Sequence, residues 1–251
     1  MDPWTGGPVT DRATCVLEAN PGPMTLDGTN TWVLAEPGSD EAVVVDPGED
    51  DPAHRAAVLE VLAGRGLRCT TVVLTHHHHD HTGGLGPFLA AVGDADVVRS
   101  TSGAFPPVDL RVGGLAMTVL ATPGHTADSL SVLLPAEGSL LTGDTLLGRG
   151  STVIAADGDV GDHVASVRLL AALPGLVTLL PGHGAPHRDP RGALELQLGH
   201  RLARLEQVRA ARAAGADTVE AVVRAVHGEL DETLHRAASS SIEAQLRYLD
   251  R

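Results

Sequence analysis

The amino-acid sequence predicts an α/β sandwich. Apolar runs of strand length recur along the chain, and several are rich in β-branched residues. Segments with apolar residues at helical spacing lie between many of these runs. Short strands with interspersed helices are typical of helices packed on sheets. The chain has 251 residues, of which 43% are hydrophobic, and is therefore long enough to bury a self-sufficient core.

The first clear strand and helix follow one another directly. Ala42–Val45 is a short apolar run of strand type. Asp51 followed by Pro52 predicts a helix start, because aspartate caps helix N-termini and proline suits the first helical position. Apolar residues at helical spacing continue the helix, and Gly64 or Gly66 ends it.

The rest of the chain repeats this alternation and closes with helices. Further strands are expected at Thr70–Thr75, Ala95–Arg99, Leu115–Ala121, Leu130–Leu134, Ser139–Leu141 and Leu176–Leu180. Further helices are expected from about Leu85 and at Asp162–Leu173, Ala193–Ala214, Thr218–Val226 and Ala237–Tyr248. Three helices at the C-terminal end predict a small helical cap.

Charge and cysteine content limit the function classes. The net charge is −14, which argues against a general phosphate-binding face but does not exclude one local cationic pocket. Cys15 and Cys69 are far apart and fit no metal-ligand spacing, so we expect reduced core thiols. We find no export signal and no apolar run of the roughly 18–20 residues that a bilayer span needs. A cytoplasmic protein without a membrane partner is therefore expected.

The stretch TVVLTHHHHDHTGG is the most unusual in the chain, because five of the six residues from His76 to His81 are histidine. A purification tag would lie at a terminus, and a nonspecific histidine tract needs no ordered context. These histidines instead follow a predicted buried strand and end in DHTGG, which favours a built site.

Alternation along an extended chain predicts which of the first four histidines share a side. His76 and His78 lie on one side and His77 and His79 on the other, because successive side chains point to opposite faces. Two imidazoles at positions i and i+2 can reach one metal ion with bonds of about 2.0–2.1 Å. We expect surface or supporting roles for His77 and His79.

More candidate ligands follow along the chain. Asp80 and His81 lie further round the turn, where they can serve a second metal ion nearby. Three others follow apolar, strand-like runs: MTVLATPGHT ends near His125, GSLLTGD at Asp144 and LVTLLPGHG near His183. Glycine or proline flanks each of them, so that a tight loop can aim the side chain into a cleft.

The combination of THxHxDHTGG, TPGHT, TGD and PGHG resembles the metallo-β-lactamase superfamily of binuclear hydrolases, over residues 25–187 approximately. The resemblance implies a four-layer αββα sandwich with two metal ions at one edge, between the sheets. It implies one ion held by His76, His78 and His125, a second held by Asp80, His81 and His183, and Asp144 bridging the two. Asp46, in VVVDPG, matches a position that hydrogen-bonds to the histidine loop and fixes ligand orientation; an ordinary turn aspartate is the alternative.

A closer resemblance is to the β-lactamase-like protein 2 group. NPGPMTLDGTNTWVL, LLGRGST and GHRLARLEQV carry it. It implies a catalytic domain at residues 1–190 and a helical, winged-helix-like domain at residues 191–251. Some members of that group are single-strand endoribonucleases, and related fungal enzymes release polyketides as acyl-carrier thioesterases. This sequence departs from the group at His163, where a tyrosine is common.

Such a site implies a hydrolase whose nucleophile is a metal-bridging hydroxide, because metal ions lower the pKa of bound water to about 7. Asp80 is the expected catalytic residue, which steers the proton. We expect a thioester, ester or lactone substrate, either a small molecule or an acyl group on a carrier. Zinc is the expected metal, with iron and manganese as alternatives for these ligands. A homodimer is compatible with the apolar positions of the C-terminal helices.

Three other functions are weighed against this one. For a single-strand endoribonuclease, Arg149, Arg201 and Arg204 could contact phosphates, although a solvated helix face also explains them. The acidic charge and the 2% aromatic content disfavour RNA, because single-strand binders stack bases on aromatic rings. A dedicated β-lactamase is less expected, since Asp80 and Asp144 stand where exported zinc β-lactamases usually have a cysteine. A non-enzymatic metal-binding module would not need the full ligand set.

Overall fold

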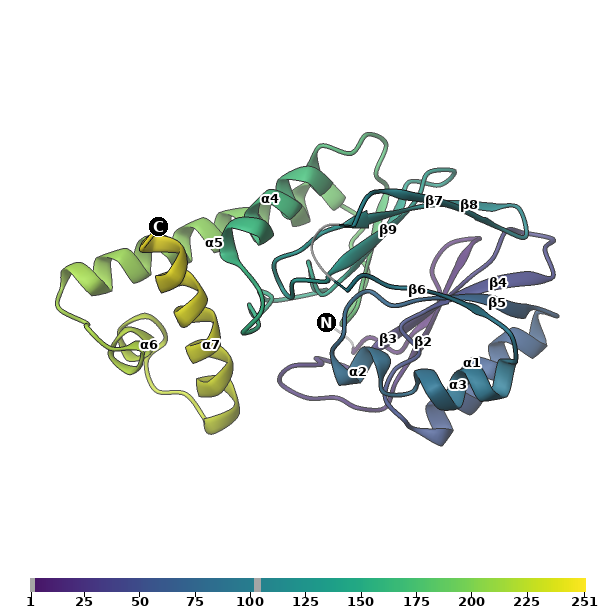
Figure 1. Ribbon diagram of the computed structural model, residues 1–251, viewed down its shortest axis with the longest axis horizontal. Helices are drawn as coiled ribbons and strands as arrows, with labels where there is room; N and C mark the ends of the chain where they lie inside the picture. Colours follow the sequence, from purple (N-terminus) through teal and green to yellow (C-terminus); the bar gives the residue numbers. More distant parts are fainter. Residues whose placement is uncertain (1–2, 102–104) are drawn as a thin grey trace.

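The computed structural model describes residues 3–101 and 105–251. Two β-sheets pack face to face, and a layer of helices covers the outer face of each sheet (Figure 1). The expected α/β sandwich with four layers is confirmed. In the part of the chain that the structure describes, every helix is too short or too polar to cross a bilayer.

The first sheet has the strand order β1-β2-β3-β4-β5-β6. Its strands are β1 (Gly7–Pro8), β2 (Ala13–Leu17), β3 (Asn30–Leu34), β4 (Glu41–Val45), β5 (Arg68–Val73) and β6 (Asp96–Val98). The pairs β1–β2, β2–β3 and β3–β4 are antiparallel, and β4–β5 and β5–β6 are parallel. Helices α1 (Pro52–Gly64) and α3 (Leu85–Val92) cover the outer face, where Val58 and Phe88 pack against strand residues such as Val44.

The second sheet has the order β11-β10-β9-β8-β7. Its strands are β7 (Val108–Val112), β8 (Leu115–Ala121), β9 (Leu130–Leu134), β10 (Ser139–Gly143) and β11 (Thr178–Pro181). All pairs are antiparallel except β10 with β11. Helices α4 (Val160–Ala171) and α5 (Pro190–Ala213) cover its outer face, where Leu170 and Leu194 pack against Leu140 and Leu179.

The main core lies between the two sheets. Trp32, Val45 and Val73 from the first sheet pack in one cluster with Met117 and Leu180 from the second. Cys15 belongs to the same cluster, and both cysteines are buried and free of disulfides, as expected. Burial of these apolar surfaces at about 25 cal/mol per Å² holds the sheets together and fixes the edge at which their strands end.

The C-terminal end of the chain forms a helical unit beside the sandwich (Figure 1). Helices α6 (Val219–His227) and α7 (Glu232–Leu249) pack on the second half of α5 through Val208, Val223 and Ile242. From Pro190 to Arg251 the structure contains helices and no strand. The division at residue 190 stays a prediction, because α5 packs on a sheet with its first half and on α6 and α7 with its second.

The structure adds strands that the sequence pattern did not predict and moves some boundaries. Strands β1, β2, β3 and β7 were not expected, nor was the short helix α2 (His79–Thr82). Helix α7 begins at Glu232, five residues before its expected start, because Asp231 caps it by accepting hydrogen bonds from Thr233 N and Leu234 N. Strand β11 begins at Thr178 rather than Leu176, since the chain before it is exposed at Val177.

Asp51 caps α1 as the sequence predicted, and its removal gives a simple test of local stability. Its side chain accepts a hydrogen bond from Ala53 N at 2.9 Å, and Pro52 occupies the first turn. We expect Asp51→Ala to lower the free energy of unfolding by about 1 kcal/mol, because one N-terminal N–H group loses its partner. Urea denaturation measures this loss. The neighbouring Asp50→Ala removes only an exposed ion pair with Arg55 and is expected to cost less than about 0.5 kcal/mol; equal losses would contradict the capping role.

Candidate metal centre

The seven candidate ligands predicted from the sequence converge at one edge of the sandwich. Each follows the end of a strand: the histidine loop and α2 come after β5, and the other three segments follow β8, β10 and β11. Ligand atoms of these residues fall into overlapping groups within 4.8 Å of one another. The groups are His76 with His78 and His125; His76 with His81 and Asp144; and Asp80 with His81 and His183.

The first group consists of three imidazoles around one point. His78 Nδ1 lies 3.0 Å from His76 Nε2 and 3.0 Å from His125 Nε2. His76 and His125 are buried, and His78 is half-buried. The expected placement of His76 and His78 on the same side of the extended chain is therefore confirmed. His77, at the intervening position, is exposed and pairs with Asp128 at 2.9 Å, and His79 is also exposed.

The second group combines imidazoles with carboxylates. His81 Nε2 lies 3.2 Å from His183 Nε2, and Asp80 Oδ2 lies 3.2 Å from His183 Nε2. Asp144 stands between the groups: its Oδ2 is 3.4 Å from His183 Nε2 and 3.8 Å from His125 Nε2. The arrangement therefore offers two sets of ligands that share one carboxylate.

The hydrogen bonds on the far side of each ring fix which nitrogen faces the centre. His125 Nδ1 donates to Val153 O at 2.6 Å, and His183 Nδ1 donates to Gly28 O at 3.2 Å. His81 Nδ1 donates to Asp46 Oδ2 at 2.9 Å. Since each neutral imidazole has one N–H group, the Nε2 atoms of these three rings carry inward-pointing lone pairs whenever the rings are neutral.

Inward-facing lone pairs need a positive charge between them. His81 Nε2 and His183 Nε2 face one another at 3.2 Å, which two acceptors tolerate only with a proton or a cation between them. Asp144 Oδ1 is buried and has no hydrogen-bond partner in the described part of the chain. An unpaired buried carboxylate oxygen is costly. The imidazole and carboxylate donors present here therefore fit divalent metal ions such as zinc.

Asp46 connects the strands to the histidine loop. The carboxylate is 1% exposed and accepts hydrogen bonds from Thr75 N (2.7 Å), Thr75 Oγ1 (2.6 Å) and His81 Nδ1. Thr75 Oγ1 in turn accepts a hydrogen bond from His76 Nδ1 at 3.0 Å. Asp46 has a φ of +53°, in the left-handed region that aspartate tolerates better than most side chains. These contacts agree with the supporting role that the resemblance implied rather than with an ordinary turn aspartate.

Burial and neighbouring charges set the protonation of the cluster. Burial lowers the pKa of His78 to about 4 and that of His76 well below its usual value, so both rings are neutral and can donate lone pairs. Burial acts in the same direction on His183, but the carboxylates of Asp144 and Asp80 outweigh it and raise its pKa well above the usual value. A cation that binds between these groups must displace that proton, so metal affinity falls as the pH falls.

At two glycines, neighbouring atoms approach the backbone too closely for any side chain to fit. A Cβ atom on Gly182 would lie 2.4 Å from Asp144 Oδ1 and 3.0 Å from His81 Cε1. Gly124 has a φ of +141°, and its Cβ would lie 2.3 Å from the Cα atom of His163. The expected tight turns beside the ligands are present at both positions.

Two other residues support the site in ways that the sequence did not predict. Asn30 is fully buried and donates through Nδ2 to Pro181 O and Gly184 O, which holds the turn that carries His183. His163, at which the sequence departs from the β-lactamase-like protein 2 group, is also fully buried, and its Nε2 donates to Thr145 O at 3.0 Å. Burial lowers the pKa of His163 to about 3, so the ring is neutral and supports the Asp144 turn.

Comparison with known proteins gives consistent results. The family model of the metallo-beta-lactamase superfamily matches residues 24–110 and 106–183. An atrochrysone carboxyl ACP thioesterase from Aspergillus chevalieri is 30% identical over 246 residues, which cover 92% of this chain and 78% of that protein. The beta-lactamase-like protein 2 homolog of Drosophila melanogaster is 31% identical and is covered to 89%, with 97% of this chain matched.

Among solved structures, a metallo-beta-lactamase family protein from Thermus thermophilus superposes with a TM-score of 0.80. The two chains are 25% identical, and the match covers 96% of this chain and 94% of that one. The similarity extends well beyond the sandwich, because a match that covers only residues 1–190 could not reach this share of the chain.

Proposed function

This chain belongs to the metallo-beta-lactamase superfamily and is a metal-dependent hydrolase, and on that premise we propose that it is a binuclear zinc thioesterase that acts on acyl thioesters. One observation carries the binuclear proposal: Asp144 lies between two separate sets of ligand atoms. The proposed ligands of one ion are His76, His78 and His125, and those of the other are Asp80, His81 and His183, with Asp144 shared.

The substrate proposal rests on chemistry and on relatives. Zinc ions at this centre would polarise the carbonyl oxygen of a thioester and lower the pKa of bound water to about 7. Two relatives with 30% and 31% identity are named ACP thioesterases, so their substrate is an acyl group on a carrier. Hydrolysis of such a thioester gives a carboxylic acid and a thiol, and it needs no serine or cysteine nucleophile.

We assign proton transfer to Asp80. Its side chain is 23% exposed, whereas that of Asp144 is 10% exposed, so Asp80 is the more accessible carboxylate for a substrate. Its Oδ2 lies 3.2 Å from His183 Nε2. Burial raises the pKa of Asp80, but the hydrogen bond to His183 and the charge of His81 outweigh burial, so the pKa lies below its usual value. The ionised carboxylate can accept the proton of the attacking water and return it to the departing thiolate.

A cavity beside the cluster suits an acyl group of moderate size. It has a volume of about 560 Å³, within the range of small-molecule sites, and His76 forms part of its wall. Leu74 and Leu85 supply apolar surface, and Arg99 adds a charged group to the same lining. Of the seven candidate ligands only His76 lines this cavity, so we propose that the acyl group lies on the His76 side of the centre.

The RNA alternative loses support at Arg149. Arg149 pairs with Asp27, and Arg201 is 5% exposed and hydrogen-bonded to Thr152 O. Arg149 is exposed but already paired with a carboxylate, and Arg201 is buried rather than on a solvated helix face. Arg204 donates to Val226 O.

A substrate panel tests the proposed function. Zinc-loaded protein is offered an acyl pantetheine thioester, a lactone, a chromogenic β-lactam and a fluorescent single-stranded RNA. We expect kcat/KM for the thioester to exceed that for the lactam by about 100-fold or more, since specificity is a ratio of these constants. Removal of metal with a chelator should abolish turnover, and added zinc should restore it. Preferred cleavage of RNA or lactam, or chelator-resistant turnover, would contradict the proposal.

A further inference from the structure

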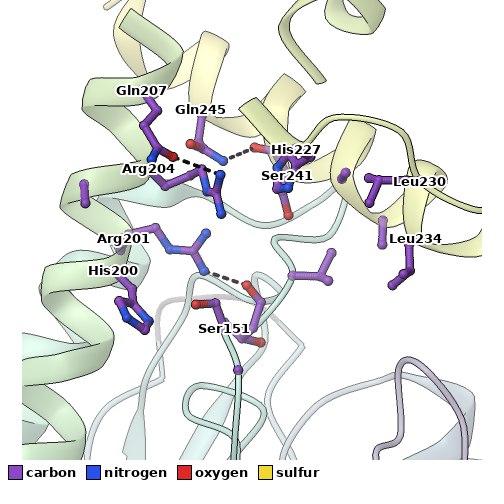
Figure 2. A pocket seen from close by; sticks show the side chains of 16 residues that line it. Ser151, His200, Arg201, Arg204, Gln207, His227, Leu230, Leu234, Ser241 and Gln245 are labelled. Atoms are coloured by element: carbon purple, nitrogen blue, oxygen red, sulfur yellow. Dashed lines mark hydrogen bonds between the residues drawn. The ribbon is translucent and has the colours of Figure 1, made fainter. Parts of the chain in front are cut away.

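A second cavity lies between the C-terminal helices and the loop that follows β10. Its volume is about 480 Å³, and we call it the C-terminal pocket. Residues of α5, the α6–α7 region and Gly150–Val153 form its wall (Figure 2). The sticks in Figure 2 place the guanidinium groups of Arg201 and Arg204 in the space between α5 and that loop.

The C-terminal pocket is positively charged in an acidic protein. Two arginines and two histidines, His200 and His227, are among its 16 lining residues, and none of those residues is an aspartate or glutamate. The chain as a whole has a net charge of −14. Two arginines without an acidic partner among the lining residues form the pattern that recognises an anion.

Arg201 carries the strongest part of this argument. The side chain is 5% exposed, and its Nη2 donates to Thr152 O at 2.6 Å, but its Nε has no hydrogen-bond partner in the described part of the chain. No salt bridge to Arg201 occurs among the described residues. A buried guanidinium without a counter-ion is costly, and a bound anion would remove the cost.

Two other buried polar atoms of the same wall lack partners. His227 Nε2 and Gln245 Oε1 have no hydrogen bond in the described part of the structure, and Gln245 is 1% exposed. Native proteins pair nearly all buried polar atoms, so several unpaired atoms around one cavity point to a missing ligand. The remaining wall is largely apolar and includes Leu230 and Leu234 (Figure 2).

The C-terminal pocket is connected to the candidate metal centre through its loop. Val153 lines the pocket, and its carbonyl oxygen accepts the hydrogen bond from His125 Nδ1. Thr152 also lines the pocket, and its Oγ1 lies 3.4 Å from His125 Nδ1. The loop that contains Thr152 and Val153 therefore separates a ligand in the pocket from the candidate metal centre. This position suits a part of the substrate that is distant from the reacting carbonyl group.

We propose that the C-terminal pocket binds the phosphate end of the phosphopantetheine arm that carries the acyl thioester, an inference that rests on the proposed thioesterase function. The phosphate matches Arg201 and Arg204, because guanidinium groups form charge-assisted hydrogen bonds to phosphate oxygens. The carbon chain beside that phosphate ester bears two methyl groups, which match Leu230 and Leu234. The wall contains no phenylalanine, tyrosine or tryptophan, so it lacks the rings on which nucleic-acid bases commonly stack.

Calorimetry on the full zinc-loaded chain tests this assignment with 4′-phosphopantetheine and pantetheine. Both probes share the thiol and differ in the phosphate alone, so their affinity ratio reports the phosphate contact. We expect 4′-phosphopantetheine to bind about tenfold or more tightly, and Arg204→Gln to remove most of that difference. Leu234→Asp, at a side chain that is 38% exposed, should do the same by placing a negative charge in the wall without disturbing the core.

Arg209→Gln is the matched control, because Arg209 lies on the same helix, is exposed and pairs with Glu206. It should leave the affinity ratio unchanged. With acyl derivatives of both probes, Arg204→Gln should raise KM for the phosphorylated thioester about tenfold and leave kcat and the unphosphorylated thioester unaffected.

The outcomes separate this inference from the proposed function. Equal binding of both probes, or a phosphate preference that survives Arg204→Gln and Leu234→Asp, overturns the assignment even if thioesters are hydrolysed. Displacement of 4′-phosphopantetheine by a short RNA of higher affinity overturns it in favour of a nucleic acid. If the phosphate preference depends on Arg204 but no thioester is hydrolysed, the proposed function fails while the phosphate site stands.

Discussion

The Asp144→Asn variant is expected to hydrolyse thioesters at least about 1,000-fold more slowly than the wild-type chain. Asp144 is the only carboxylate in the described part of the chain that contacts both sets of candidate ligands, with its oxygens 3.4–3.8 Å from His81, His125 and His183. The amide keeps the shape of the side chain but removes the negative charge. Metal ions contribute several kcal/mol to catalysis, and about 4 kcal/mol corresponds to three orders of magnitude in rate.

Two measurements accompany this prediction. Metal analysis should show fewer than two ions per chain in Asp144→Asn, and the thioester assay should show the loss in kcat. Asp109→Asn serves as the control, because Asp109 is an exposed residue of β7 that pairs with Thr118 away from the cluster. Normal turnover by folded Asp144→Asn protein that retains two ions would refute the shared-ligand role.

Local patterns predicted β8 and β9, whose apolar residues face the main core. The expected ends of β8 and β9 agree with the structure, since both strands show buried apolar residues in short, bounded runs. Strand β3 was missed because Asn30 and Thr31 are polar and yet fully buried. Asn30 donates to the carbonyl groups of Pro181 and Gly184, and Thr31 donates to that of Asp46. A local sequence pattern does not reveal partners as distant along the chain as Pro181 and Gly184.

The same distinction applies to the sites. The seven candidate ligands were found from the sequence because each follows a strand, and strand ends gather at one edge of a sandwich. Arg201 was expected on a solvated face or at a phosphate, and its burial could not be foreseen. That burial depends on how the loop before α4 and the helix α7 pack on α5, which is a tertiary contact.

Asp46→Asn is expected to weaken metal binding by about 10–100-fold, the range that supporting hydrogen-bond partners of metal ligands show. Thr75 N is a fixed donor, so the amide oxygen of asparagine must take the Oδ1 position to accept its hydrogen bond. The amide NH₂ group then occupies the Oδ2 position, where it faces Thr75 Oγ1 and His81 Nδ1.

This exchange reverses the direction of two hydrogen bonds. His81 Nδ1 must become an acceptor, which moves the ring proton to Nε2, the atom that faces the metal ions. Thr75 Oγ1 must accept from the amide and donate to His76 Nδ1, which moves the proton of His76 to its inward-facing Nε2 as well. One substitution therefore blocks a ligand in each set, although asparagine tolerates the left-handed backbone at this position.

Chelator competition with zinc measures the affinity, and thermal unfolding of the metal-free protein checks that the fold is retained. Thr75→Ser keeps the hydroxyl and is expected to bind zinc as the wild type does, whereas Thr75→Val should lose part of the affinity through His76 alone. Because the backbone N–H of Thr75 cannot change its role, the tautomer shift is forced rather than one of several options. Unchanged zinc affinity in folded Asp46→Asn protein would show that Asp46 positions the loop without setting the tautomers of His76 and His81.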